Sequence, residues 1–183
     1  MKNYSPGAIA NYFLKKSWKE NHLLTPMQLQ KLMYFANGWY MAFYNNEGEI
    51  LPLINEPFQA WEYGPVCSSV YHEFKGFGNN VIPKNYLMKE VRISEDLLDM
   101  EIVWNEVPAK DLLSIELLEK IWSRYSSLTA FQLSEMTHLN DEKNPWRIAR
   151  SIAKNEGIIR GKEINNEHIK TYFKKLLDEN RAY

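Results

Sequence analysis

The stretch LTPMQLQKLMYFANGWYMAFY, residues 24–44, decides the fold. Thr25 can accept a hydrogen bond from the backbone of Gln28, and Pro26 stands where a helix tolerates its missing N–H, so a capped helix start is predicted here. Apolar side chains then recur at helical spacing and spread to most sides of the helix: they are Leu29, Leu32, Met33, Tyr34, Phe35, Ala36, Trp39, Tyr40 and Phe43. Because helices of this kind are usually buried, we expect this one at the centre of a bundle.

Several shorter helices are expected on both sides of the central one. Start signals and apolar spacing predict them over about residues 6–20, 111–126, 129–136, 145–156 and 166–182. Thr129 with Gln132 repeats the capping box, and Asn144 before Pro145 gives another start. We therefore expect a mainly α fold, a compact bundle of six or seven short helices with a small antiparallel β element. It forms one domain over residues 1–183, with the helix near 166–182 as a C-terminal extension.

The β element is expected between residues 50 and 63, where two prolines break the helical pattern and Phe58 and Trp61 favour one or two short strands. Gly64-Pro65 then predicts the start of a helix that ends at Gly76 or Gly78. Residues 79–107 are less regular. Short strands around 94–96, a loop with one hairpin, and a short helix all stay open for that segment.

Composition limits the function classes. The 183 residues carry 22 basic and 23 acidic side chains, a net charge of −1, which argues against a strongly basic nucleic-acid binder. One cysteine, Cys67, excludes an intramolecular disulfide framework. The N-terminus lacks the pattern of a secretory signal, and no window is apolar enough to cross a bilayer. We expect a cytoplasmic protein without a membrane partner.

Motifs for catalysis, metals and cofactors are weak. The four histidines have no partner at i+3 or i+4, so no metal site is predicted. His138 near Asp141 and Glu142 fits a polar turn better than a ligand set. Cys67 fits a packed thiol better than a nucleophile, and the G-x-G at residues 76–78 fits a helix stop rather than a phosphate loop. No catalytic residue and no cofactor is therefore predicted.

Two other surfaces are candidates for binding. Basic residues recur on one side of two helices and could contact phosphate, or be solvated: they are Arg147, Arg150 and Lys154, then Lys170, Lys174 and Lys175. Aromatic residues crowd the end of the central helix. Because aromatic side chains are enriched at interface centres, Trp39, Tyr40 and Tyr44 are the candidate partner surface, with core packing as the alternative.

Three segments together resemble a known family. They are residues 24–36, residues 58–66 continuing to Phe74, and residues 133–147, which contain Thr137-His138 and Pro145-Trp146. Their order and spacing are similar to those of the Panacea domain of prophage and toxin–antitoxin proteins, which includes SocA-like antitoxins and phage-associated GepA-like proteins. The resemblance covers about residues 6–155. The tail beyond residue 155 matches nothing further than a capped amphipathic helix.

The resemblance implies an antitoxin that neutralises a protein toxin encoded by a neighbouring gene, often in a prophage, with no catalytic step of its own. The residues that match the family motifs are Thr25, Pro26, Gln28, Lys31, Leu32, Tyr34, Phe35, Trp61, Tyr63, Gly64, Pro65, Val66, Tyr71, Thr137, His138, Pro145 and Trp146. We expect these to be scaffold or partner-binding positions, and the toxin-specific surface to lie in residues 79–107 and in the tail.

Alternatives to direct neutralisation stay open. The chain could be an adaptor that delivers the toxin to a protease, a DNA-binding regulator of its own operon, or an enzyme built around Lys31, Tyr63 and His138. A dimer within the toxin complex is a further alternative. The sequence ranks the enzyme last, because motif analogy alone does not supply a reaction.

Overall fold

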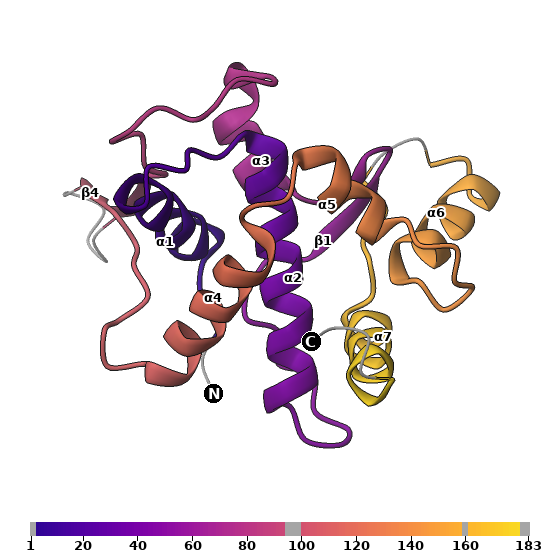
Figure 1. Cartoon of the computed structure of the whole chain (residues 1–183). Coiled ribbons are helices and arrows are strands. Elements are labelled where there is room, and N and C mark those ends of the chain that lie inside the picture. Colours follow the sequence, from indigo (N-terminus) through magenta and orange to yellow (C-terminus); the bar gives the residue numbers. More distant parts are fainter. Residues whose placement is uncertain (1–2, 94–99, 159–160, 180–183) are drawn as a thin grey trace.

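Helix α2 (Pro26–Tyr44) runs through the middle of the molecule (Figure 1). A computed structural model of the chain describes residues 3–93, 100–158 and 161–179. In α2 the Thr25 side chain accepts from the Gln28 backbone, and the Gln28 side chain accepts from the Thr25 N–H, so the predicted capping box is confirmed. Every residue from Leu29 to Ala42 is buried, including polar ones. The prediction of a buried central helix is therefore confirmed.

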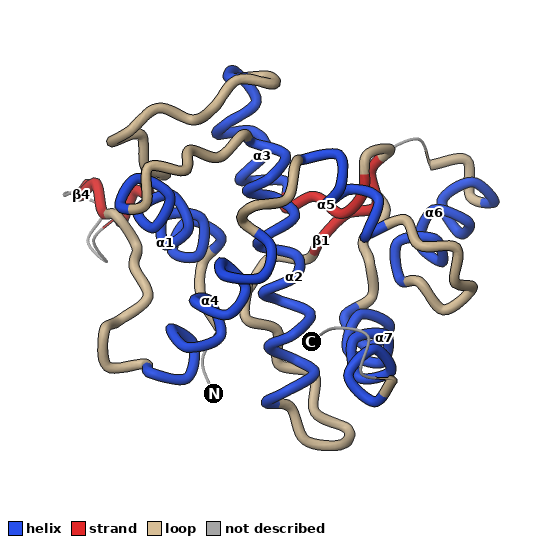
Figure 2. The backbone as a smooth tube through the Cα atoms, in the orientation of Figure 1, coloured by secondary structure: helices blue, strands red, loops and turns tan. Residues whose placement is uncertain are grey.

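The other described helices surround α2 and make the fold mainly α, as predicted (Figure 2). They are α1 (Pro6–Lys19), α3 (Ser68–Phe74), the 3-10 helix η1 (Lys75–Phe77), α4 (Leu112–Tyr125), α5 (Ala130–Thr137), α6 (Pro145–Asn155) and α7 (Asn166–Asp178). Side-chain caps begin α5, α6 and α7 at Thr129, Asn144 and Asn165. These caps satisfy backbone N–H groups that a helix start leaves without partners.

Within the described residues, the named strands form two short antiparallel hairpins. Strands β1 (Phe58–Trp61) and β2 (Gly64–Cys67) pair Trp61 with Gly64 and leave a two-residue turn of Glu62 and Tyr63. The prediction that Gly64-Pro65 starts a helix is wrong. Gly64 has a φ of +99°, which turns the chain back along β1, so the helix begins only at Ser68.

The second hairpin lies in the segment that the sequence left open. Strands β3 (Glu90–Ile93) and β4 (Met100–Val103) pair Glu90 with Val103 and Ile93 with Met100, which confirms the hairpin alternative. These strands lie on either side of residues 94–96, so the expectation of short strands around them is confirmed too, while residues 94–96 themselves lie outside the described residues.

The C-terminal segment belongs to the same core as the rest of the fold. The backbone of Ala60 donates to Lys162 and that of Ile164 donates to Phe58, so residues 162–164 run along the edge of β1. Helix α7 then packs on α2 at Gly38, where an added Cβ would lie 2.4 Å from the Phe173 ring. The helix expected as an extension thus completes the cover of α2.

Candidate functional site

The turn of the β1–β2 hairpin is where the predicted family-motif residues converge. Its three consecutive carbonyls each face a side chain from α5 or from the residues beyond it. Ser134 Oγ donates to the Tyr63 carbonyl at 3.1 Å, and Trp146 Nε1 donates to the Trp61 carbonyl at 2.7 Å. His138 Nε2 lies 3.3 Å from the Glu62 carbonyl oxygen. Side chains therefore hold an exposed turn in one position.

The residues that hold the turn also hold one another. The His138 ring packs edge-on to the Trp146 ring at 4.0 Å, and its Nδ1 lies 2.6 Å from the Ser134 carbonyl oxygen. Asn144 caps α6 and also donates to the Thr137 carbonyl at 3.1 Å. The motif residues Thr137, His138, Pro145 and Trp146 thus form the junction of α5 and α6 behind the hairpin.

Helix α2 holds the hairpin from the opposite side through two neighbouring polar residues. The buried Gln30 amide accepts from Cys67 N at 2.8 Å and donates to Cys67 O at 3.0 Å, as a neighbouring strand would. Lys31 Nζ donates to the Pro65 carbonyl at 3.1 Å. Sequence reasoning missed Gln30. The available signal was an amide in a helix that is apolar on most sides, because a buried amide needs partners.

A cavity of about 280 Å³ lies between this hairpin, the start of α2 and the end of α3. We call it the hairpin pocket. Its lining residues are Pro26, Met27, Gln30, Lys31, Trp61, Glu62, Tyr63, Val66, Tyr71, Lys75, Gly78 and Asn79. The centroids of the Trp61 and Tyr71 rings lie 4.6 Å apart, and the Tyr63 side chain is 64% exposed. Six predicted residues therefore share one cavity: Pro26, Lys31, Trp61, Tyr63, Val66 and Tyr71.

Lys31 is the unusual member of the lining. Its side chain is 1% exposed, and burial lowers the pKa of its ammonium from the ordinary 10.5 to about 7. Gly64 makes room for it: an added Cβ there would lie 2.6 Å from Lys31 Nζ and 2.6 Å from Thr137 Oγ1. A lysine with a lowered pKa in a cavity is a recognised mark of functional sites.

Other motif residues take part in helix capping and in the core. Thr25 and Gln28 form the capping box of α2, and Gln28 Nε2 also donates to the Leu128 carbonyl at 3.1 Å, which ties α2 to the start of α5. Leu32, Tyr34 and Phe35 lie in the core. Of the three residues of the enzyme alternative, Lys31 and Tyr63 line the pocket, whereas His138 lies behind the hairpin turn.

The prediction of a partner surface at Trp39 and Tyr40 is wrong. Trp39 is 4% and Tyr40 is 3% exposed, and the Trp39 indole donates to the Tyr125 hydroxyl at 3.1 Å. Tyr44 is half-buried and contacts Tyr40 edge-on. Their aromatic area is used against α4 and α7, so the alternative of core packing holds for this cluster.

The second basic strip also serves the fold. Lys170 is buried and donates to the carbonyls of Asn46 and Glu49, and Lys175 pairs with Asp141 at 2.6 Å. Two of the three lysines are therefore engaged within the chain. Cys67, expected inside a helix, ends β2, and burial raises the pKa of its thiol to about 12, which opposes thiolate chemistry.

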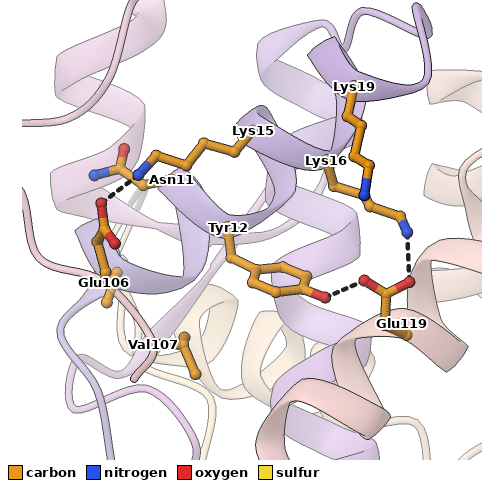
Figure 3. A pocket seen from close by; sticks show the side chains of 9 residues that line it. Asn11, Tyr12, Lys15, Lys16, Lys19, Glu106, Val107 and Glu119 are labelled. Atoms are coloured by element: carbon orange, nitrogen blue, oxygen red, sulfur yellow. Dashed lines mark hydrogen bonds and ion pairs between the residues drawn. The ribbon is translucent and has the colours of Figure 1, made fainter. Parts of the chain in front are cut away.

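A second cavity of about 270 Å³ lies on α1, and charged side chains in its lining pair with one another (Figure 3). Glu119 accepts from Tyr12 and from Lys16, the latter at 2.5 Å, and Lys15 pairs with Glu106. This network joins α1 to α4 and to the segment after β4. Lys15 and Lys16 thus have carboxylate partners inside the chain, and these pairs serve the fold.

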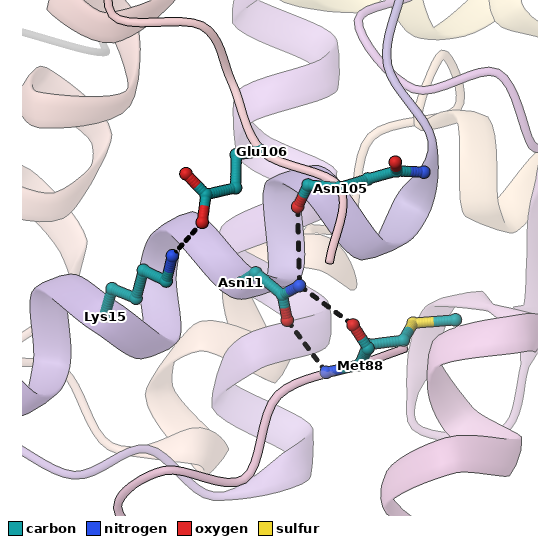
Figure 4. Close-up of polar contacts among 5 residues, drawn as sticks. All are labelled: Asn11, Lys15, Met88, Asn105 and Glu106. Atoms are coloured by element: carbon teal, nitrogen blue, oxygen red, sulfur yellow. Dashed lines mark hydrogen bonds and ion pairs between the residues drawn. The ribbon is translucent and has the colours of Figure 1, made fainter. Parts of the chain in front are cut away.

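Asn11 on α1 holds the residues on both sides of the β3–β4 hairpin (Figure 4). Its Nδ2 donates to the Met88 carbonyl at 2.9 Å and to the Asn105 carbonyl at 3.4 Å, and its Oδ1 accepts from Met88 N at 2.8 Å. One buried side chain on α1 therefore anchors the chain both before β3 and after β4.

Comparison with known proteins identifies the class. Residues 29–147 match the family model described as "Antitoxin SocA-like, Panacea domain", and the chain therefore belongs to this family of antitoxins. It is similar to Antitoxin SocA of Caulobacter vibrioides (strain NA1000 / CB15N), with 30% identity over 168 residues, 91% of this chain and 81% of that protein. No solved structure matches. The family implies a cognate toxin as partner.

Two features bear on the remaining expectations. Among the described residues, no helix combines the length and apolarity that crossing a membrane requires. Within the same residues, no three His, Cys, Asp or Glu side chains gather as a metal-binding group.

Proposed function

We propose that this chain neutralises a cognate protein toxin by binding it directly, as a non-catalytic cytoplasmic antitoxin. Membership of the antitoxin family supports this reading. The observation that carries the direct-binding part is that exposed apolar side chains recur along residues 81 to 113: they are Val81, Tyr86, Ile102, Trp104, Leu112 and Leu113. We propose that these side chains form the toxin-specific surface.

The exposure of this group is large for apolar residues. Leu112 is 73%, Leu113 56% and Trp104 50% exposed. Burial of exposed apolar surface is a main favourable contribution to protein association. The Asn11 hydrogen bonds and the Lys15–Glu106 pair hold the residues before β3 and after β4 on α1, so part of the ordering cost of this region is met before a partner arrives.

The alternatives concern the fate of the bound toxin. An adaptor that delivers the toxin to a protease would use the same surface, so the two versions differ in whether rescue needs that protease. A regulator that binds DNA is less supported, because Lys170 and Lys175 of the second basic strip are engaged within the chain. A dimer in the toxin complex and a prophage origin stay part of the proposal.

Co-expression with the protein of the neighbouring gene tests this function. We expect growth rescue and a complex that co-purifies at low salt and micromolar concentration, with at least ~1,000 Å² of buried surface. Rescue in a strain without the relevant protease separates blocking from delivery. No rescue and no complex would contradict direct neutralisation.

A paired variant locates the surface. Leu112→Ser with Leu113→Ser should weaken the complex at least tenfold, because both side chains are exposed and their loss leaves the core unchanged. Ile152→Ser on α6, at a site 38% exposed, is the matched control and should bind as the wild type does. Equal binding by the double variant would place the toxin elsewhere.

A further inference from the structure

Lys31 is a buried cation whose charge is only partly compensated within the chain. In the part of the chain that the structure describes, its Nζ makes one hydrogen bond, to the Pro65 carbonyl at 3.1 Å. An ammonium has three N–H donors, and a buried charge without an opposite charge is costly. Two donors are left for water or for a ligand in the hairpin pocket, whose wall includes Lys31.

Among the described residues, no carboxylate forms an ion pair with Lys31. Glu62 also lines the pocket, but no ion pair joins it to Lys31 among the described residues. The cavity on α1 shows the contrast, since Lys15 and Lys16 there have Glu106 and Glu119 as partners. The start of α2 adds the positive end of a 19-residue helix dipole, and no acidic residue lies in its first turn. The pocket thus favours an anionic group.

The remaining lining favours an apolar group beside that anion. Met27, Val66, Trp61 and Tyr71 supply sulfur, aliphatic and aromatic surface to the same cavity. Its volume of about 280 Å³ suits one residue of a peptide rather than a helix or a strand. A chain terminus presents a carboxylate and an apolar side chain on one residue, whereas Asp and Glu bring the carboxylate alone.

We propose that the hairpin pocket binds the carboxyl terminus of the partner protein, with the terminal carboxylate on Lys31 and an apolar last side chain against Trp61 and Tyr71. The pocket holds this residue in place because the hairpin turn is fixed by Ser134, His138 and Trp146. Capture of a C-terminal carboxylate is an established mode of peptide recognition. The inference rests on the proposed function for its partner, but its chemistry is testable without the toxin.

Binding of N-acetyl-leucine to the purified full chain tests the chemistry. We expect a saturable shift of the Trp61 indole N–H resonance at millimolar concentrations, as befits a single residue. N-acetyl-leucinamide, which lacks the charge, and acetate, which lacks the side chain, should each bind at least tenfold more weakly. Equal binding of the amide would overturn the role of Lys31, and equal binding of acetate would overturn the terminal apolar residue.

Two variants complete the test. Lys31→Met should lose the response to N-acetyl-leucine, and Lys170→Met, which replaces the other buried lysine, should keep it. Retained binding in Lys31→Met would overturn the proposal, as would the absence of any saturable shift in the wild type up to about 20 mM. Because no toxin is present, these outcomes are independent of the co-expression result that tests the proposed function.

Discussion

Two buried lysines, Lys31 and Lys170, are held in different ways. Lys170 is 6% exposed and donates to two carbonyls, Asn46 at 2.5 Å and Glu49 at 2.6 Å, in the loop after α2. Lys31 is 1% exposed and donates to one carbonyl at 3.1 Å, beside a cavity. The first arrangement closes a loop on α7. The second leaves a cation with unused donors.

The number of hydrogen bonds to a buried charge separates a structural lysine from a functional one. A buried lysine that replaces its water shell with several short hydrogen bonds stabilises the fold. A buried lysine with few hydrogen bonds destabilises the folded state, and the lowered pKa of Lys31 reflects that cost. Proteins retain such residues where function needs them, at the expense of stability.

Gly64→Ala should give the largest effect, because Gly64 creates the space that Lys31 occupies. Its φ of +99° disfavours any side chain, and the new Cβ would meet Lys31 Nζ and Thr137 Oγ1 at 2.6 Å. We expect a loss of roughly 4 kcal/mol in the free energy of unfolding, measured by denaturant titration.

Gly48→Ala is the matched control for that change. Gly48 has a φ of +77° and nothing within 4 Å of the added Cβ, so only backbone strain remains. We expect a loss of about 1 kcal/mol. Equal losses at the two glycines would show that contact with Lys31 contributes nothing.

Lys31→Met should stabilise the free protein, by roughly 3 kcal/mol at pH 6, because it removes a poorly compensated buried charge. The gain should depend on pH. Between pH 7 and 10.5 the unfolded wild type keeps a proton that the folded form has lost, so wild-type stability rises with pH there. The advantage of the variant should therefore be full below pH 7 and shrink towards pH 10, as unfolding titrations across that range would measure. A pH-independent difference would contradict the lowered pKa of Lys31.

Lys170→Met should destabilise the free protein, in contrast to Lys31→Met. The carbonyls of Asn46 and Glu49 lose the Lys170 ammonium as a donor, and we expect a loss of about 2 kcal/mol in the free energy of unfolding. Thermal unfolding beside Lys31→Met measures the contrast. A stabilised Lys170→Met protein would remove the distinction between the two lysines.

Thr25→Ala should give the smallest effect. Loss of the cap at the start of α2 should cost about 1 kcal/mol, and Thr129→Ala at the second capping box about the same. Only the first change borders the hairpin pocket, so it alone should weaken N-acetyl-leucine binding, by up to a few-fold. Equal binding by both variants would show that the helix start does not contribute to the pocket.

Local chemistry made much of the fold predictable. The capping boxes at Thr25 and Thr129 and the Asn144-Pro145 start depend on residues three apart, and all three are present in the structure. Gly64 misled because Gly-Pro fits a helix start and also the first residues of a strand that follows a two-residue hairpin turn, as here, where Gly64 pairs with Trp61. The site was predictable only as a set of motif residues. Spacing does not reveal that Lys31 points at Pro65, nor that Trp39 faces α7 instead of solvent.

Toxin neutralisation by Lys31→Met beside Lys170→Met, scored as growth at matched soluble levels of both variants, tests most directly whether Lys31 binds the partner. We expect Lys170→Met to protect the cell although its fold is weakened, and Lys31→Met to fail to protect although its fold is stabilised. Full protection by Lys31→Met would contradict this expectation, because the buried lysine would then have no part in binding the partner.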